Sequence, residues 1–248
     1  MARAAVLGRL SWQLATVSAL IDETPDVRSI ELEVPAWRGH RAGQHVDVRL
    51  TAEDGYQAQR SYSIASAPED EQLVLTVERL EDGEVSPYLV GELRPGDKLE
   101  MRGPVGGYFV WEEALGGPLL LVAGGSGVVP LRSILRHYRA VGSTVPVRML
   151  YSARTFEDVI YRDELTRFTE DGVEVHITLT RTQPEGWSGY GRRVDPELLE
   201  AVSWPPSERP LIYVCGPTAF VETAASAFVV LGHEPTRIRT ERFGPTGP

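Results

Sequence analysis

The sequence is poor in the residues that build several common kinds of site. Its 248 residues include one cysteine, Cys215, so the chain can form no internal disulfide and cannot supply the four thiolates of an iron–sulfur cluster. Lys98 is the only lysine, so no other residue could form a Lys-centred phosphate loop or a Schiff base. The sequence has no asparagine, which excludes N-glycosylation. The five histidines show no metal-ligand spacing, and we expect no metal.

Positive charge and long apolar runs are also scarce. The chain has 25 basic and 35 acidic residues, and a formal net charge of −10 leaves no general basic surface for a nucleic acid. No stretch reaches the ~18 to 20 apolar residues of a membrane span. Arg9, Gln13 and Thr16 interrupt the apolar N-terminus before it is long enough for a signal peptide. We therefore expect a cytoplasmic protein with no membrane or nucleic-acid partner.

The first half of the chain has the pattern of a β structure. Apolar residues recur two apart in segments 30–34, 46–50 and 73–77, which is the period of a half-buried antiparallel strand. Turns rich in glycine, proline and aspartate separate these segments. Residues 1–114 are therefore predicted to form an antiparallel β-barrel domain.

The second half changes to fully apolar runs that alternate with helical segments. Continuous apolar runs are typical of parallel strands buried on both faces. Strands are expected at 118–123, 147–151, 173–180, 211–214 and 237–242, and helices at 130–139, 156–168 and 218–231. Residues 115–248 are thus predicted to form an α/β domain with a doubly wound parallel sheet.

A glycine-rich turn, Gly124 to Pro130, lies between the first of these strands and the helix after it. Glycines let the backbone approach a pyrophosphate, and the free N–H groups of a first helical turn favour an anion. The turn lacks the Gly-Lys-Ser/Thr of a P-loop and the frame of Gly-x-Ser-x-Gly, which argues against ATPase and hydrolase chemistry. The favoured ligand is a nicotinamide dinucleotide, although a tight turn without any ligand also needs glycine.

The segment Arg60-Ser-Tyr-Ser63 follows a predicted strand and combines a cation, an aromatic ring and hydroxyls. Residues two apart on a strand share a face, so Arg60 and Tyr62 could touch one ligand while Ser63 meets it at the strand end. This set suits a phosphorylated aromatic cofactor. A surface arginine beside a half-buried tyrosine would give the same pattern.

Six motifs occur in the order and spacing of the ferredoxin–NADP(+) reductase superfamily. They are Arg60-Ser-Tyr-Ser63, Gly83-Glu-Val-Ser86, Gly103-Pro-Val-Gly106, Gly125-Ser-Gly-Val-Val-Pro130, Cys215-Gly-Pro217 and Glu241-Arg-Phe-Gly244. Together they are far more specific than any one of them. Over residues 12–248 the chain resembles the reductase components of bacterial oxygenases, which implies an FAD-binding barrel followed by an NAD(P)-binding α/β domain.

The resemblance also implies a set of FAD-binding residues. Arg60 would neutralise the pyrophosphate, Tyr62 would lie on one face of the isoalloxazine ring, and the Ser63 hydroxyl would lie beside flavin N5. The turn from residue 83 to residue 86 would hold the pyrophosphate through backbone N–H groups and a hydroxyl. The FAD set is Arg60, Tyr62, Ser63, Arg79, Gly83, Val85, Ser86 and Phe243.

A second set of residues is implied for NAD(P). The Cys215 thiol would lie beside nicotinamide C4 and the Glu241 carboxylate near the hydride path, so Ser63, Cys215 and Glu241 are the predicted catalytic residues. Phe243 matches an aromatic that covers the second flavin face, but the chain continues beyond it, which leaves its stacking open. The NAD(P) set is Gly125, Ser126, Gly127, Pro130, Arg154, Arg181, Cys215, Gly216 and Pro217.

Two arginines favour NADPH over NADH. The second α/β strand ends at Arg154, with no acidic residue there to bind a ribose 2′-hydroxyl. Arg181 resembles the arginine of the Ser-Arg element that binds the 2′-phosphate in plant-type reductases. We expect NADPH because arginine recognises phosphate well, and NADH remains open. Trp187 or Tyr190, on a glycine-rich loop, could cover the adenine.

The residues and the resemblance together predict a monomeric reductase. NAD(P)H would deliver a hydride to FAD, and electrons would then pass singly to a separate acceptor protein such as a ferredoxin or an oxygenase component. One alternative is an NAD(P)H:flavin reductase that supplies free reduced flavin. Another is a flavin-binding relay subunit that never binds nicotinamide.

Overall fold

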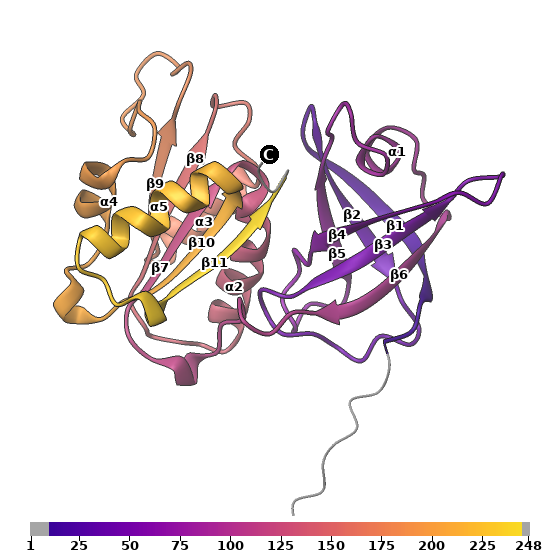
Figure 1. The fold of residues 1–248 in the computed structure, drawn as a ribbon, viewed down its shortest axis with the longest axis horizontal. Coiled ribbons are helices and arrows are strands. Elements are labelled where there is room, and N and C mark those ends of the chain that lie inside the picture. Colours follow the sequence, from indigo (N-terminus) through magenta and orange to yellow (C-terminus); the bar gives the residue numbers. More distant parts are fainter. Residues whose placement is uncertain (1–9, 245–248) are drawn as a thin grey trace, which may run out of the picture.

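The computed structural model describes residues 10–244, which form two halves (Figure 1). We call residues 10–114 the barrel half and residues 115–244 the α/β half. The predicted division between them falls in the segment that joins strands β6 and β7. No helix within the described residues is long and apolar enough to cross a membrane.

The barrel half is a six-stranded antiparallel sheet, which confirms the fold expected from the two-residue periodicity. The strand order is β4-β3-β6-β1-β2-β5, and a bridge between Ile64 and Leu75 joins the two outer strands at one end. Alternate side chains such as Val46 and Met101 fill its centre. The elements are β1 (Gln13–Thr24), β2 (Val27–Glu33), β3 (His45–Thr51), β4 (Gln57–Ser63), β5 (Leu73–Glu78), α1 (Ser86–Gly91) and β6 (Lys98–Val105).

Strand β4 differs from the sequence expectation. Residues 60–63 lie inside this strand, not after one. Only Ala58 of β4 is fully buried, so the strand has no apolar alternation that could reveal it. Strands β1 and β6 also lie outside the predicted segments.

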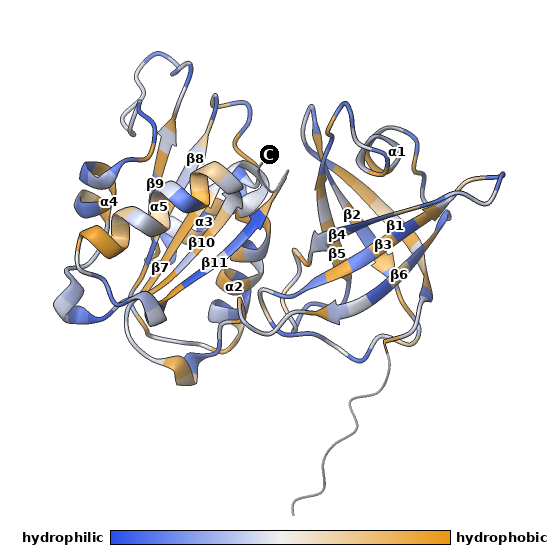
Figure 2. Ribbon diagram, in the orientation of Figure 1, coloured by the Kyte–Doolittle hydropathy of each residue, from blue (hydrophilic) through white to orange (hydrophobic). Residues whose placement is uncertain are grey.

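The α/β half is a five-stranded parallel sheet with helices on both faces, as predicted. The strand order is β11-β10-β7-β8-β9. Helices α2 and α3 pack on one face and helices α4 and α5 on the other. Every residue of the central strand β7 is buried, and the strand is largely hydrophobic (Figure 2). The elements are β7 (Leu119–Gly124), α2 (Val128–Ala140), β8 (Val147–Ala153), α3 (Arg162–Glu170), β9 (Glu174–Leu179), α4 (Pro196–Val202), β10 (Leu211–Pro217), α5 (Thr218–Val230) and β11 (Ile238–Phe243); short 3-10 turns lie at Glu113–Leu115, Gly125–Gly127, Pro206–Glu208 and Pro235–Arg237.

One predicted helix begins later than expected. The pattern predicts a helix over 156–168, but α3 begins at Arg162. The Thr155 backbone N–H and hydroxyl both donate to the Asp158 carboxylate at 3.0 Å, which forms a turn, and Tyr161 has a φ of 59°, which an α-helix cannot include. Helix α4 was not predicted, although Asp195 caps it by accepting from the Leu198 N–H at 2.9 Å.

The two halves meet through a packed and charged interface. The Ser133 hydroxyl of α2 donates to the Ser66 carbonyl at 2.6 Å, across the two halves. Arg136 of α2 donates to both oxygens of Asp70 in the barrel half, at 2.7 and 2.8 Å, and to Glu164 of α3 at 2.7 Å. Fully buried Trp111 packs in the same core as the α2 side chains. These contacts hold the two halves against each other.

Candidate functional site

Two adjoining cavities lie between the halves. The barrel pocket, about 350 Å³, lies between β4, the turn 80–86 and the ends of β10 and β11. The sheet-end pocket, about 400 Å³, lies beyond the carboxyl ends of β7 and β8, where ligands bind in open parallel sheets. Glu78, Ser126 and Phe243 line both pockets, so two ligands would meet at this shared wall.

The barrel pocket collects most of the predicted FAD residues. Arg60 and Tyr62 of β4 pair with Val48 and Val46 of β3, which places them on one face of the strand, as predicted. Burial raises the pKa of the Tyr62 hydroxyl, so this ring stays neutral and can lie against an aromatic ligand. The predicted residues that line this pocket are Arg60, Tyr62, Ser63, Gly83, Val85, Ser86, Cys215, Glu241 and Phe243.

The turn at residues 83–86 is shaped for glycine. A Cβ atom at Gly83 would lie 2.8 Å from the Ser86 Oγ and 3.0 Å from the Leu80 carbonyl oxygen, so no other residue fits without a shift. Ser86 Oγ accepts from the Leu80 N–H at 3.1 Å. The turn is thus a tight concave loop at the start of α1, of the kind that holds anions through backbone N–H groups.

Both arginines that are predicted to bind FAD have carboxylate partners. Arg60 forms an ion pair with Glu84, and the Tyr56 hydroxyl donates to the same carboxylate at 2.6 Å. Arg79 forms an ion pair with Asp26 and does not line the barrel pocket. The structure therefore brings Arg60 to the pocket with its charge already balanced, and it leaves Arg79 outside.

Cys215, Glu241 and His45 meet where the barrel pocket reaches the α/β half. Burial raises the pKa of Glu241 to about 7, and its Oε2 has no hydrogen-bond partner within residues 10–244. Its Oε1 lies 3.7 Å from His45 Nδ1, and burial lowers the pKa of that histidine. Burial, together with the nearby Glu241, raises the pKa of the Cys215 thiol. At neutral pH the group therefore holds a thiol, a neutral imidazole and a carboxyl that can gain or lose a proton.

The glycine turn after β7 interlocks with the turn after β10. A Cβ atom at Gly127 would lie 2.1 Å from the Cys215 carbonyl oxygen, so glycine alone allows the two turns to approach. A Cβ atom at Gly216 would lie 2.8 Å from the Phe220 ring. Of the predicted NAD(P) residues in these turns, Gly125, Ser126 and Pro217 line the sheet-end pocket, whereas Gly127, Pro130 and Gly216 do not.

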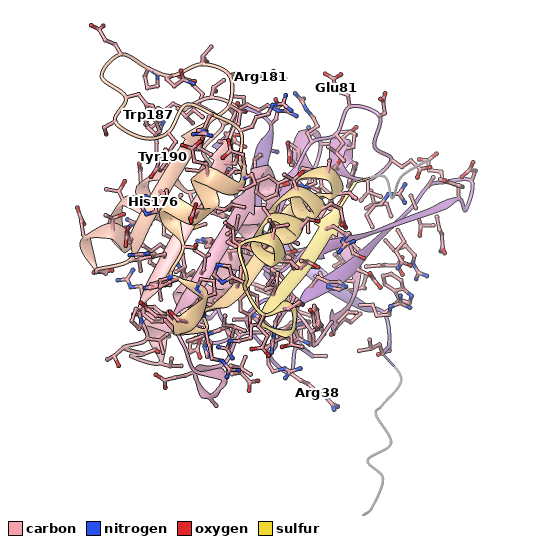
Figure 3. The ribbon with its side chains drawn as sticks, turned by 60° about the vertical axis from the view of Figure 1, so that its left-hand side comes forward. Arg38, Glu81, His176, Arg181, Trp187 and Tyr190 are labelled. Carbon is pink, nitrogen blue, oxygen red and sulfur yellow. The ribbon has the colours of Figure 1, made fainter. Side chains whose placement is uncertain are left out.

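The lining of the sheet-end pocket includes unpaired positive charge. Arg154 and Arg193 line the pocket. Arg181 does not line it, but its backbone N–H donates to the Arg154 backbone carbonyl at 2.9 Å. None of these three arginines has a carboxylate partner in the part of the chain that the structure describes. Trp187 does not line the pocket, because its ring packs edge-on to Phe156 with centroids 5.8 Å apart (Figure 3). Tyr190 is also outside the lining.

His45, Glu78 and Arg193 are among the lining residues that escaped the sequence reasoning. His45 pairs directly with Ser63 across β3 and β4, and only the strand register brings it there. Glu78 ends β5 and Arg193 follows the loop after β9, and neither belongs to a motif. Among the described residues there is no cluster of three His, Cys, Asp or Glu that could hold a metal ion.

The residues present fit a flavin and a nicotinamide dinucleotide. Each pocket adjoins a glycine turn in which a Cβ atom would lie too close to neighbouring atoms, at Gly83 and at Gly127, and each has arginine among its lining residues. Glu241, whose buried Oε2 has no hydrogen-bond partner among the described residues, lines the barrel pocket.

Comparison with known proteins supports the same pair of ligands. A model of the oxidoreductase FAD-binding domain matches residues 15–110, and a model of the oxidoreductase NAD-binding domain matches residues 121–226. The FAD/NAD-binding domain of nitric oxide dioxygenase from Vibrio cholerae has the same fold, with a TM-score of 0.85 at 23% identity over 94% of this chain and 99% of that one.

Curated relatives are similar over most of the chain. The glycine betaine monooxygenase reductase subunit of Pseudomonas aeruginosa is 32% identical over 235 residues, covering 92% of this chain and 63% of that protein. Ferredoxin–NADP reductase B of Sorangium cellulosum is 38% identical over 204 residues, covering 78% of this chain and 81% of that protein. The chain thus spans less than two thirds of the first relative. It belongs to the ferredoxin–NADP(+) reductase superfamily, with an FAD-binding domain followed by an NAD-binding domain.

Proposed function

We propose that this chain is an FAD-dependent NAD(P)H reductase that supplies electrons to a separate protein. The observation that carries this proposal is the wall of Glu78, Ser126 and Phe243 shared by the two pockets, because a hydride can pass only between ligands in contact. The chemistry that FAD supplies when bound is acceptance of a hydride and release of electrons one at a time. We place the FAD domain at residues 1–114 and the NAD(P) domain at residues 115–248.

The barrel half would bind and orient the flavin. Arg60 and the turn at 83–86 would hold the pyrophosphate, with charge-assisted and backbone hydrogen bonds. Tyr62 would support one face of the ring system and the Ser63 hydroxyl would donate to its edge. Phe243, with 37% of its surface exposed, would cover the other face and has room to move aside.

The α/β half would bring the nicotinamide to the flavin and exclude water from it. The turn Gly125 to Gly127 and the start of α2 would hold its pyrophosphate. Buried Cys215 would shape the contact with the nicotinamide ring. Glu241, whose pKa is raised to about 7, would hold a proton at Oε2 or give it up near neutral pH, beside His45.

The preference for NADPH rests on the three unpaired arginines. Arg154 and Arg193 provide positive charge in the lining of the sheet-end pocket, where a 2′-phosphate would lie, and the Arg181 backbone is bonded to that of Arg154; no acidic partner neutralises these arginines within residues 10–244. Asp158 also lines this pocket, but it accepts hydrogen bonds from Thr155.

The acceptor would be a ferredoxin or an oxygenase component. A single cysteine means that this chain supplies no iron–sulfur cluster of its own. One relative is named as the reductase subunit of a monooxygenase and another as a ferredoxin–NADP reductase, which supports an iron–sulfur or oxygenase partner.

The visible spectrum of the purified protein, recorded without oxygen before and after one equivalent of NADPH or NADH, tests the proposal. A flavin spectrum that bleaches faster with NADPH is the expected result. A colourless protein that reduces added flavin would point to a free-flavin reductase instead. A yellow protein inert to both nucleotides would point to a relay subunit.

A further inference from the structure

Among the described residues, Glu78 is the one acidic residue that lines both pockets. It ends β5 of the barrel half, and its Oε2 accepts a hydrogen bond from the Ser126 hydroxyl of the α/β half at 2.6 Å. Ser126 lies in the glycine turn that leads into α2. The contact therefore crosses from one half to the other at the wall that the two pockets share.

The charge of Glu78 is not balanced by a cation. The neighbouring Arg79 is turned to Asp26, and no ion pair of Glu78 occurs within the residues that the structure describes. The unpaired arginines Arg154 and Arg193 line the sheet-end pocket but not the barrel pocket. The sheet-end pocket thus has an uncompensated negative charge on the wall that it shares with the barrel pocket and uncompensated positive charge elsewhere in its lining.

A dinucleotide in the sheet-end pocket would need the Ser126 hydroxyl, which already donates a hydrogen bond to Glu78. Its pyrophosphate is negative and would lie at the turn before α2, where a serine hydroxyl is a natural donor to a phosphate oxygen. The Ser126 hydroxyl has one O–H group, so it can donate a hydrogen bond either to the Glu78 carboxylate or to the phosphate. The carboxylate also repels the phosphate charge over a short distance.

We propose that Glu78 competes with the pyrophosphate of the nicotinamide nucleotide for the Ser126 hydroxyl, and thereby limits how tightly the nucleotide is held. This inference rests on the proposed function, because it takes NAD(P) as the ligand of the sheet-end pocket. Weaker holding favours release of the oxidised nucleotide after it has given up its hydride, which frees the shared wall for the next step. The residue sets affinity and takes no part in the chemistry.

The test is calorimetric titration of NADP⁺ and of NAD⁺ into the FAD-loaded full chain and five variants, four with one substitution and one that combines Ser126→Ala with Glu78→Ala. Glu78→Ala removes both the acceptor and the charge, and should tighten binding about tenfold; Glu78→Gln keeps a neutral acceptor and should tighten it about threefold. Ser126→Ala removes the contested hydroxyl, so in that background Glu78→Ala should gain about threefold at most, from charge alone. Glu81→Ala is the matched control, an exposed acid three residues further on that lines neither pocket (Figure 3).

Three results would overturn the inference. They are unchanged or weaker binding in both Glu78 variants, a gain of the same size in Glu81→Ala, and a full tenfold gain that persists in the Ser126→Ala background. Glu78→Gln keeps the size of the side chain, so it still decides the question should Glu78→Ala fold poorly. If the wild-type protein binds neither nucleotide, the proposed function fails; if it binds them and the Glu78 variants bind equally, this inference alone fails.

Discussion

The two pockets differ in whether their arginines have carboxylate partners. In the barrel pocket, Arg60 is already paired with Glu84, while the arginines near the sheet-end pocket, Arg154, Arg181 and Arg193, have no carboxylate partner within residues 10–244. The composition follows the same division: residues 10–114 include 20 acidic and 9 basic residues, and residues 115–248 include 15 and 14. Flavin binding would depend on shape, burial and an arginine whose charge is already paired, whereas the exchanging nucleotide would be attracted by unpaired charge, which acts over longer distances and is screened by salt.

The largest effect should come from Gly127→Ala, which should impair hydride transfer between the two pockets without loss of FAD from the barrel pocket. The added Cβ would lie 2.1 Å from the Cys215 carbonyl oxygen, so the turns after β7 and β10 must move apart. Flavin reduction by NADPH should slow at least about a hundredfold, because the reacting groups lose their alignment, while FAD stays bound. Stopped-flow bleaching and the visible spectrum measure the two effects. Gly91→Ala, where an added Cβ meets nothing within 4 Å, is the control; loss of FAD from Gly127→Ala would show that the pockets are not separable.

The next effect should come from the unpaired arginines. Replacing Arg154 and Arg181 together by Gln should weaken NADPH binding about thirtyfold and change NADH binding less than about threefold, since only NADPH has the additional phosphate. Steady-state KM and binding titrations with both nucleotides measure this. Arg38→Gln removes one positive charge at the opposite end of the molecule and should change neither nucleotide (Figure 3). Equal losses for both nucleotides would mean that the arginines bind a feature common to the two.

A smaller effect concerns Glu241, which lies where the pockets meet. Its folded pKa of about 7 is above the ordinary value of 4.5, so its contribution to stability is full below pH 4.5 and is lost as the pH rises to about 7. Between those pH values the stability of the wild type should fall relative to Glu241→Gln by about 1 to 2 kcal/mol, less than the full shift implies because a quarter of the side chain is exposed.

Urea unfolding of both proteins across this pH range checks the sign. His45 titrates in both proteins, so its contribution largely cancels from the difference. A difference that does not vary with pH would mean that Glu241 keeps an ordinary pKa.

The smallest effect should come from Glu84→Gln in the barrel pocket. Arg60 would lose its charged partner and could give more of its hydrogen bonding to a pyrophosphate, so FAD should bind about threefold more tightly. Fluorescence titration of the flavin-free protein measures this, with Glu53→Gln, an exposed acid outside both pockets, as the control. Weaker FAD binding in Glu84→Gln would show that the ion pair orients Arg60 for FAD. The pairing of Arg60 would then position its side chain, and would not reduce its attraction for the pyrophosphate.

The fold and most of the candidate site could be predicted from the sequence for a physical reason. Period-two alternation and fully apolar runs report burial directly, which is why both sheets could be predicted. Turns such as Gly83 and Gly127 could be found because close contacts leave only glycine possible. Contacts that depend on how strands pair could not be found: His45 reaches Ser63 through strand register, and Glu78 reaches Ser126 only when the two halves dock. The helix predicted over 156–168 began late because local side-chain hydrogen bonds around Asp158 competed with helix formation.

The position of β11 at the edge of its sheet has a consequence for hydrogen exchange. β11 pairs with β10 on one side only, whereas β10 is bonded on both sides. This edge strand carries Glu241 and Phe243, so two site residues are held by a single ladder of backbone hydrogen bonds. Amide protons of β11 should therefore exchange with deuterium well before those of β10 or β7. Local opening of this one strand would release the aromatic cover and the carboxyl group while the rest of both pockets stays intact.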